Sequence, residues 1–549
     1  MGDSVDIIEP VENPTDATEP VSVEQPSEIV YMSGIRLWLA GLGLALSVVL
    51  PALEVSIVST SLITIGNALN DYDQISWLVT AYLVTYTGFL VIWSKLCDLF
   101  GLKPTMFVSM VLFMGFSAGC GAAQSMTQLI IFRAFQGVGG SGLYSITTIG
   151  FIQMVPPTRY TQITAVASSL MSLGMILGPL LGGAINDGHH WRWVFYLNVP
   201  AGFVALVIVM LTFPKGFPHT HNRDKEKTTP WILQIVKKPD ILGAFLLLGA
   251  SILFVAALEE GGVRFPWNSA IIIVFFTVSG LLWIAFFLWE WYASREGSLV
   301  EPMFPWRFFS NRVWMGTLLG CFLSGAPLTI AVIELPQRYQ IVNASSPLDA
   351  GVKLLAYAAA CPLGVVMASM ATGRLRFPFV AVMLLGCTLQ SVGFGLLSTL
   401  PTYTENWNGQ YGYSVIAGLG TGSTIGALYM LGPIAVQKKD QALAIGSGLQ
   451  FRMLGGALGI AVMNTVLNSY INSHLPLLLD GAQLIGVLDS ASRIALLPQE
   501  LQDEVRAVYG QGYNLQMRVT LAFSAAVLFS IALVWKKKPL RLGKDGRLE

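Results

Sequence analysis

The chain alternates long apolar stretches with short polar segments over nearly its whole length. A helix needs roughly 20 mostly apolar residues to cross a bilayer core about 30 Å thick. Of the 549 residues, 54% are hydrophobic and 12% are charged. The stretches long enough to cross are residues 38–62, 75–95, 105–123, 128–153, 162–185, 192–213, 240–258, 270–290, 313–334, 350–370, 379–399, 411–434, 442–467 and 516–535. We therefore expect an all-α polytopic membrane protein with 14 transmembrane helices.

The positions of the basic residues test this count, because Lys and Arg collect in the cytoplasmic loops of membrane proteins. With the N-terminus placed in the cytoplasm, most of the 32 Lys and Arg residues fall in alternate loops or in the C-terminal tail on that side. Only Arg133 and Arg452 lie well inside predicted spans. A miscount by one span would disturb the alternation, so both termini are predicted to be cytoplasmic.

The loop between the second and third spans carries the first recognisable motif. It reads Ser-Lys-Leu-Cys-Asp-Leu-Phe-Gly-Leu-Lys-Pro over residues 94–104. This resembles the Gly-x-Leu-x-Asp-Arg-x-Gly-Arg-Arg/Lys signature of the major facilitator superfamily, although Ser94 replaces the first Gly and two leucines replace arginines. The resemblance implies that Asp98, Gly101 and Lys103 form a conformational switch that braces the inward-closed state. An ordinary positive-inside loop is the alternative.

The fourth span contains a buried base. Its pattern Leu-x-x-x-Arg-x-x-Gln-Gly-x-Gly-Gly over residues 129–140 is similar to a second motif of the same superfamily. A guanidinium inside a span is costly, so Arg133 should face the bundle interior and find a partner. Residues 137–142 also fit Gly-x-Gly-x-x-Gly, but no strand precedes them, which excludes a dinucleotide site.

The fifth span resembles the superfamily motif associated with antiport, and the motif residues are Gly174, Gly178, Pro179, Gly182 and Gly183. Three of these glycines recur every four residues, so they share one helix face that another helix can approach closely. The proline removes a backbone donor and bends the helix. We expect a close-packed, kinked surface on which two halves of the protein can rock, with helix packing alone as the alternative.

The first span holds an acidic residue, Glu54, that we predict to carry the coupling proton, with Arg133 as the other residue of the proton-coupling site. Residues 53–62 read Leu-Glu-Val-Ser-Ile-Val-Ser-Thr-Ser-Leu, which resembles an element of the 14-span drug:proton antiporters with Glu54 in place of Asp. Desolvation and a nearby base act in opposite directions on the proton affinity of a buried carboxyl group, which can bring proton exchange near neutral pH. The alternative is that Glu54 faces the outer headgroups or caps a neighbouring element.

Further matches to that family lie at residues 191–202, 240–243 and 451–459, so the resemblance runs from about residue 50 to residue 460. An internal repeat supports two six-helix halves, with Arg452 as a buried cation of the second half. The predicted segments are an acidic disordered tail 1–34, an N-terminal half 35–213, a cytoplasmic linker with two inserted helices 214–310, a C-terminal half 311–536 and a basic tail 537–549. The C-terminal half includes a long outer loop, 468–515, in which we expect short helices.

The family implies secondary transport by alternating access, and we expect proton-driven efflux of a bulky, largely apolar toxin, drug or secondary metabolite, as in fungal efflux pumps. The chain has no P-loop, so ATP is not the direct energy source. The few other acidic groups near spans, Glu259, Glu290 and Glu334, are too sparse for a highly charged substrate. A siderophore permease or a vacuolar basic amino acid carrier is the competing reading, and a membrane enzyme or receptor is less well supported, because no catalytic cluster is visible.

The remaining expectations concern the surroundings of the protein. We expect a monomer in the cell membrane, with the vacuolar membrane as the alternative, whose partners are a small-molecule substrate, protons and the lipid bilayer, with no nucleic acid. No cofactor or metal is expected, and the five scattered cysteines indicate neither disulfides nor zinc. The sequon at Asn343 is predicted to lie outside and to accept a glycan.

Overall fold

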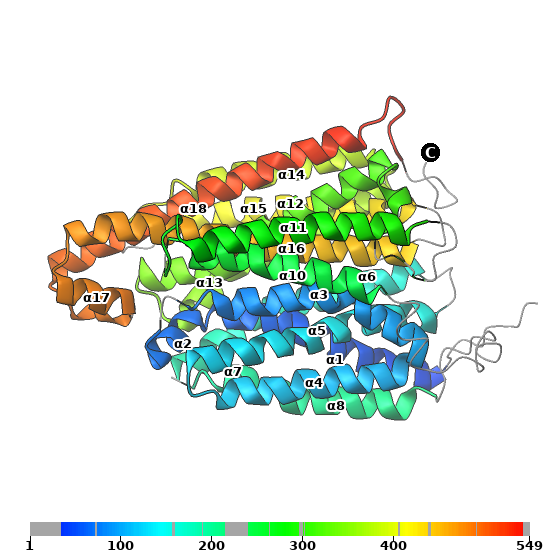
Figure 1. The fold of residues 1–549 in the computed structure, drawn as a ribbon, viewed down its shortest axis with the longest axis horizontal. Helices are drawn as coiled ribbons and strands as arrows, with labels where there is room; N and C mark the ends of the chain where they lie inside the picture. Colours follow the sequence, from blue (N-terminus) through cyan, green and yellow to red (C-terminus); the bar gives the residue numbers. More distant parts are fainter. Residues whose placement is uncertain are drawn as a thin grey trace, which may run out of the picture.

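The computed structural model describes residues 34–541 except 72–73, 156–159, 189, 215–239, 263, 296–299, 301, 303, 404–406, 437–440 and 490. Over this part of the chain the regular elements are helices (Figure 1). Their bounds are α1 Gly34–Ser59, α2 Leu62–Leu69, α3 Trp77–Phe100, α4 Leu102–Ala122, α5 Met126–Met154, α6 Tyr160–Asp187, α7 Trp193–Tyr196, α8 Asn198–Thr212, α10 Ile241–Glu260, α11 Ala270–Ala293, η3 Trp306–Phe308, α12 Arg312–Ile341, α13 Pro347–Gly373, α14 Phe379–Leu397, α15 Gly409–Ile434, α16 Gln441–His474, η5 Leu475–Leu477, α17 Gly481–Asp489, η6 Ala491–Leu496 and α18 Gln499–Val534. Residues 1–33 of the predicted tail, residues 215–239 of the predicted linker and most of the basic tail lie outside the described residues.

Every predicted span coincides with a helix, counting α7 and α8 together, and the all-α polytopic class is confirmed. In the described residues, 11 helices are long and apolar enough to cross a membrane, and Trp77–Leu90 of α3 is a shorter apolar stretch. Helices α5 and α6 are not among the 11, so the count of 14 stays a prediction. Outward-facing side chains such as Leu211, Phe529 and Leu281 are 76%, 71% and 65% exposed, which is how a bundle presents itself to lipid.

The helices form two groups that repeat one packing pattern. In the first group α1 packs on α6 and α8, α5 packs on α3 and α4, and α4 packs on α8. In the second group α12 takes the place of α1, α16 that of α6 and α18 that of α8, while α15 packs on α13 and α14. Glycines allow the tight pairs in both groups, since a Cβ on Gly174 would meet Ala52 of α1 and one on Gly459 would meet Ala326 of α12.

Helices α10 and α11 stand outside this repeat. Helix α10 packs on α3 of the first group and on α16 of the second, and α11 packs on α10. Asp240 fixes the start of α10, because its carboxylate accepts from the backbone N–H of Gly243 at 2.8 Å and from Trp289 Nε1 of α11 at 2.6 Å. The Asp-x-x-Gly motif at 240–243 is therefore a helix cap that also joins the two inserted helices.

The predicted outer loop 468–515 is mostly helical. Helix α16 continues to His474, and α18 begins at Gln499 rather than near residue 516, so the connection between them is 475–498. The short helices expected there are present as η5, α17 and η6. Hydropathy marks where the membrane ends and not where a helix ends, and beyond that point apolar residues such as Leu475, Val487 and Tyr509 pack into a small core of their own.

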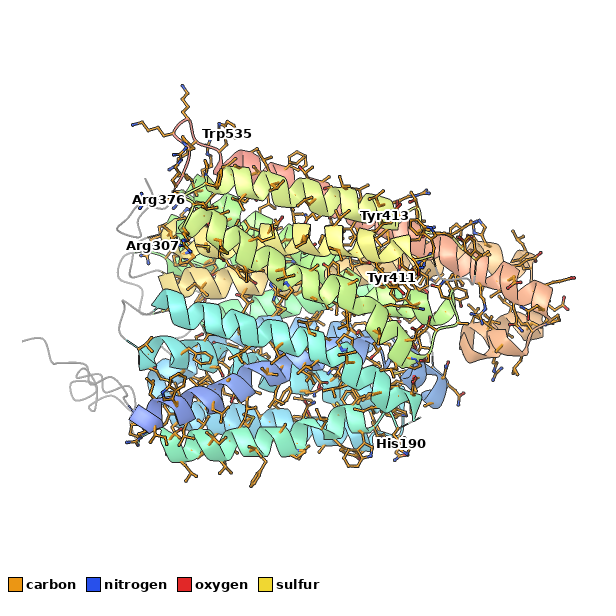
Figure 2. All side chains as sticks on the ribbon, turned by 180° about the vertical axis from the view of Figure 1, so that it is seen from behind. His190, Arg307, Arg376, Tyr411, Tyr413 and Trp535 are labelled. Carbon is orange, nitrogen blue, oxygen red and sulfur yellow. The ribbon has the colours of Figure 1, made fainter. Side chains whose placement is uncertain are left out.

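Both ends of the described chain lie at one end of the bundle, and α17 lies at the other (Figure 1). Figure 2 shows Arg307, Arg376 and Trp535 at the end of the termini, with His190 toward the opposite end. We call the end that holds both termini the terminal end, and the end that carries α17 the distal end. Arg307 and Arg376 thus lie at the same end as the termini, and the cytoplasmic orientation of that end stays a prediction.

Candidate functional site

Glu54 and Arg133 form a buried ion pair between α1 and α5. Arg133 Nη1 donates to Glu54 Oε1 at 2.5 Å, and the Arg133 and Glu54 side chains are 1% and 0% exposed respectively. The two residues are 79 positions apart in the sequence. Each charge therefore has the partner that a buried ionised group needs. Both sequence-predicted residues of the proton site are thus brought together.

Neighbouring helices complete the shell around Arg133. Its Nε donates to the carbonyl of Leu78 in α3 at 2.8 Å, and Nη1 also donates to Gln136 Oε1 at 2.7 Å. The amide of Gln136 in turn donates to Ser117 Oγ of α4 at 2.6 Å. The ring of Tyr82 lies 4.4 Å from the guanidinium carbon, in cation–π geometry. The guanidinium is thus held in one orientation by α1, α3 and its own helix α5, and Gln136 links it to α4.

Asn198 is the member of the site that the sequence alone did not identify. Its side-chain amide donates to Glu54 Oε2, so the two carboxylate oxygens bind different partners. Asn198 is fully buried and begins α8, 144 residues from Glu54. A polar side chain inside the apolar motif 191–202 was the available signal. The amide can bond a carboxylate or a protonated carboxyl group, because it offers both a donor and an acceptor.

The ion pair lies nearer the distal end of the bundle than the terminal end. Glu54 is near the end of α1, and Arg133 is near the start of α5, and both of those helix ends are distal. Contacts between the two helix groups gather at the same level. Gln340 Nε2 donates to the carbonyl of Thr60 at 3.2 Å, and the N–H of Leu348 donates to Asp187 Oδ1 at 3.3 Å. Any opening at the distal end has to break these bonds.

Glu259 makes a further distal contact between the groups. Its carboxylate accepts from Ser76 Oγ at 2.7 Å and from Thr80 Oγ1 at 2.9 Å, both in α3. Asn464 of α16 donates to both carboxylate oxygens at 3.4 Å. The inserted helix α10 therefore joins the first group to the second through one carboxylate.

The glycine motif of α6 serves two different neighbours. Gly178 and Gly182 pack on α1, where a Cβ on Gly178 would overlap Ser56 Oγ and approach the backbone N of Ile57 to 2.8 Å. On the other face, a Cβ on Gly183 would lie 2.6 Å from Leu348 Cα of α13. The repeated glycines thus bind α6 within its own group. The contact with α13 of the second group is made instead by Gly183 and by the backbone carbonyl of Pro179.

The structure describes two of the three predicted switch residues in the loop motif 94–104. Gly101 has φ +88°, a conformation that favours glycine, and it separates α3 from α4. Lys103 Nζ donates to the carbonyl of Phe213 at 3.0 Å, at the C-terminal end of α8, where a positive charge interacts well with the helix dipole. The side chain of Asp98 lies outside the described residues, so its expected contact stays a prediction.

Arg452 is the buried cation that the sequence predicts in the second half, and its surroundings differ from those of Arg133. Its side chain lies among Tyr86 of α3, Tyr144 of α5 and Tyr429 of α15, close enough for electrostatic interaction with all three. Tyr429 accepts a side-chain hydrogen bond from the Arg452 guanidinium, Nη2 lies 3.7 Å from the sulfur of Met453, and within the described residues Nε has no hydrogen-bond partner. Arg452 thus faces both helix groups without a paired carboxylate.

Asn343 lies just after α12 at the distal end, as expected for an outer sequon. Its side chain is only 8% exposed, and the hydroxyl of Ser345 accepts from Lys353 Nζ at 2.5 Å. Attachment of a glycan would require this turn to open, so the fold disfavours the predicted modification. The five cysteines are buried, and no disulfide joins them.

Comparison with known proteins places these features in context. Residues 44–300 match the family model described as "Major Facilitator Superfamily". The chain is 42% identical to the MFS-type transporter FPY5 of Fusarium mangiferae, over 93% of this chain and 85% of that one. It is 28% identical to the rubrofusarin-specific efflux pump aurT of Gibberella zeae, over 93% of this chain and 91% of the pump. It is 30% identical to multidrug resistance protein 3 of Bacillus subtilis, over 79% of this chain and 80% of that protein.

Among solved structures, a bacterial homologue of the human lysosomal transporter Spinster, in an inward-facing and unoccupied conformation, has a similar fold. The TM-score is 0.61 at 15% sequence identity, over 92% of this chain and all of that one. A D-xylose–proton symporter gives a TM-score of 0.55 at 12% identity, over 87% of this chain and 97% of the symporter. Both likenesses concern the helix arrangement alone.

Proposed function

Because this chain belongs to the major facilitator superfamily, whose members are membrane transporters and not in general enzymes, we propose that it exports a bulky, largely apolar organic compound in exchange for protons. The observation that carries the proposal is the buried Glu54–Arg133 ion pair. Proton exchange needs a carboxyl group that is ionised in one conformation of the transporter and protonated in another. A carboxylate held by one guanidinium between two helices meets that need.

Protonation would act on this pair directly. A proton on Glu54 removes the charge that Arg133 Nη1 binds, while Gln136 Oε1 and the carbonyl of Leu78 still accept from the guanidinium. Asn198 can keep contact with the neutral carboxyl group through its amide oxygen. The consequence is a weaker link between α1 and α5. Helix α1 carries α6 with it through the packed glycines, and α6 touches α13 of the second group.

The proposed motion is alternating access between two six-helix halves, 35–213 and 311–536, with the inserted helices of 214–310 beside them. The repeated packing pattern and the distal contacts between the helix groups support it. With both termini cytoplasmic, the distal end is the outer end, and the described contacts close that end. Efflux as the direction is supported by the names of the relatives and by the glycine and proline motif of α6.

The substrate class follows from relatives and composition. The rubrofusarin pump and the multidrug resistance protein are named for the export of organic compounds or for drug resistance. Fourteen tryptophans, 29 phenylalanines and 19 methionines supply apolar and aromatic surface in this chain. The protein is proposed to act as a monomer in the cell membrane.

The test is Glu54→Gln in proteoliposomes that contain the full chain. We expect transport driven by a pH gradient to be lost, while exchange of substrate without a gradient continues. Glu500→Gln, a change of the same kind at an exposed carboxylate in the first turn of α18, is the matched control and should behave as the native protein does. Undiminished gradient-driven transport by the Glu54 variant would remove this residue from the mechanism.

A further inference from the structure

The two arginines that are buried well inside predicted spans, Arg133 and Arg452, have opposite electrostatic situations. Arg133 donates to three acceptors, one of them the carboxylate of Glu54. Arg452 is 8% exposed, and its electrostatic neighbours in the described structure are tyrosines and not carboxylates. A guanidinium stays protonated in a protein, so its charge cannot be relieved by loss of a proton. A buried cation of this kind calls for an anion, and none of the described residues that act on Arg452 supplies one.

The position of Arg452 fits a site between the two helix groups. It lies near the middle of the predicted span 442–467, about 17 Å along α16 from its start at 1.5 Å per residue. Tyr86 and Tyr144 belong to the first group, whereas Tyr429 and Arg452 belong to the second. Ligands of transporters built from repeats bind near the midplane, where the repeats meet. The four side chains are gathered at such a place.

The aromatic side chains define the shape of an acceptable ligand. The rings of Tyr86 and Tyr144 have centroids 6.5 Å apart and a tilt of 52°. The ring of Tyr429 lies 6.0 Å from the guanidinium carbon of Arg452 and is 37% exposed, so this ring is accessible. Tyrosines offer flat apolar faces for stacking and hydroxyl groups for hydrogen bonds. Arg452 Nε is one of the buried donors that have no hydrogen-bond partner in the described residues.

We infer that Arg452, Tyr86, Tyr144 and Tyr429 bind the exported compound, and that this compound is an aromatic molecule with one acidic group, such as a carboxylate or a phenolate. The inference rests on the proposed export function and narrows its substrate class. The acidic group accepts from the Arg452 guanidinium, in which the geometry of the donors suits an oxyanion. The aromatic body lies against the tyrosines of both helix groups. The ligand thus supplies the missing negative charge.

Two xanthene dyes of similar shape and different charge test the site, because fluorescein is an anion and rhodamine 123 is a cation at neutral pH. Binding to the purified full chain in detergent is measured by fluorescence anisotropy. We expect the native protein to bind fluorescein more tightly than rhodamine 123. Arg452→Gln should weaken fluorescein binding at least tenfold and leave rhodamine 123 binding unchanged or tighter. Arg518→Gln, at an exposed arginine of α18, is the matched control and should change neither.

Thermal unfolding without ligand separates this role from a structural one. Removal of an unpaired buried charge should leave the unfolding midpoint of Arg452→Gln equal to the native value or higher. A structural arginine would give a lower midpoint, as we expect for Arg133→Gln. Arg452→Lys retains the charge without the planar fork, so its fluorescein affinity should fall between those of the native and Gln proteins.

The outcomes divide clearly between the two proposals. Equal affinity of the native protein for both dyes, or unchanged fluorescein binding in Arg452→Gln, overturns the acidic-ligand site even if gradient-driven transport is present. A markedly lower thermal unfolding midpoint in Arg452→Gln than in the native protein also contradicts the acidic-ligand site. Conversely, the charge preference together with an absence of pH-driven transport by the native protein would leave the site standing and overturn proton-coupled export.

Discussion

Adding a single methyl group at Gly178 should disturb both the packing and the proton site. In Gly178→Ala the new Cβ would overlap Ser56 Oγ and lie 2.8 Å from the backbone N of Ile57. The hydroxyl can rotate away, but the backbone cannot. Helices α1 and α6 would have to separate by about 0.6 Å, the difference between 2.8 Å and the 3.4 Å at which ordinary van der Waals contact begins.

The size of the effect follows from two opposing terms. Overpacking of a tight contact costs about 1–3 kcal/mol. Replacing Gly by Ala inside a helix returns up to about 1 kcal/mol. A net loss of about 0–2 kcal/mol in unfolding free energy is expected for Ala, and a larger loss for Leu. Glu54 lies two residues from Ser56 on α1, so its distance to Arg133 changes as well, and transport should fall more than stability does.

The assay compares Gly178→Ala with Gly280→Ala, a change in α11 where a new Cβ meets nothing within 4 Å. Only the helix-propensity term acts in the control, which should unfold at the native midpoint or above. Thermal unfolding in detergent gives stability, and accumulation of an amphipathic toxin in intact cells gives export. If both variants unfolded and exported alike, α6 would not be close-packed on α1 and the reasoning would fail. Higher accumulation in cells with the native protein than in cells without it would indicate import instead of export.

Three further outcomes are expected. Arg133→Met should cost about 3–5 kcal/mol, because it leaves Glu54 as a buried charge without its cation, and the unfolding midpoint measures this loss. A cysteine introduced at Leu477, which is 79% exposed at the distal end, should react with an impermeant maleimide in intact cells. A cysteine introduced at Leu375, which is 63% exposed, should react only after the cells are permeabilised. The reverse pattern would invert the topology. Glycosidase treatment should leave the electrophoretic mobility of the native protein unchanged, and Asn343→Gln should export normally, because Asn343 is 8% exposed.

The sequence was sufficient for the properties that depend on neighbouring residues. Hydropathy sums over about 20 adjacent residues, so it located a helix at every predicted span and predicted the polytopic class correctly. The motifs at 129–140 and 174–183 led to the superfamily, and the comparisons confirm that assignment. The same local information overextended the outer loop 468–515, because polar residues at 499–515 continue a helix outside the membrane.

The partners within the site were decided by the tertiary structure. The sequence assigned Glu54 and Arg133 to proton coupling but could not show that they bond to each other across 79 residues, or add Asn198 to the other carboxylate oxygen. Which face of α6 meets α1 and which meets α13 depends on the rotation of each helix about its axis. Many weak contacts between distant segments set that rotation. Chain position fixes which residues are available, while only the packed bundle fixes which charges are paired and which, like that of Arg452, are left for a ligand.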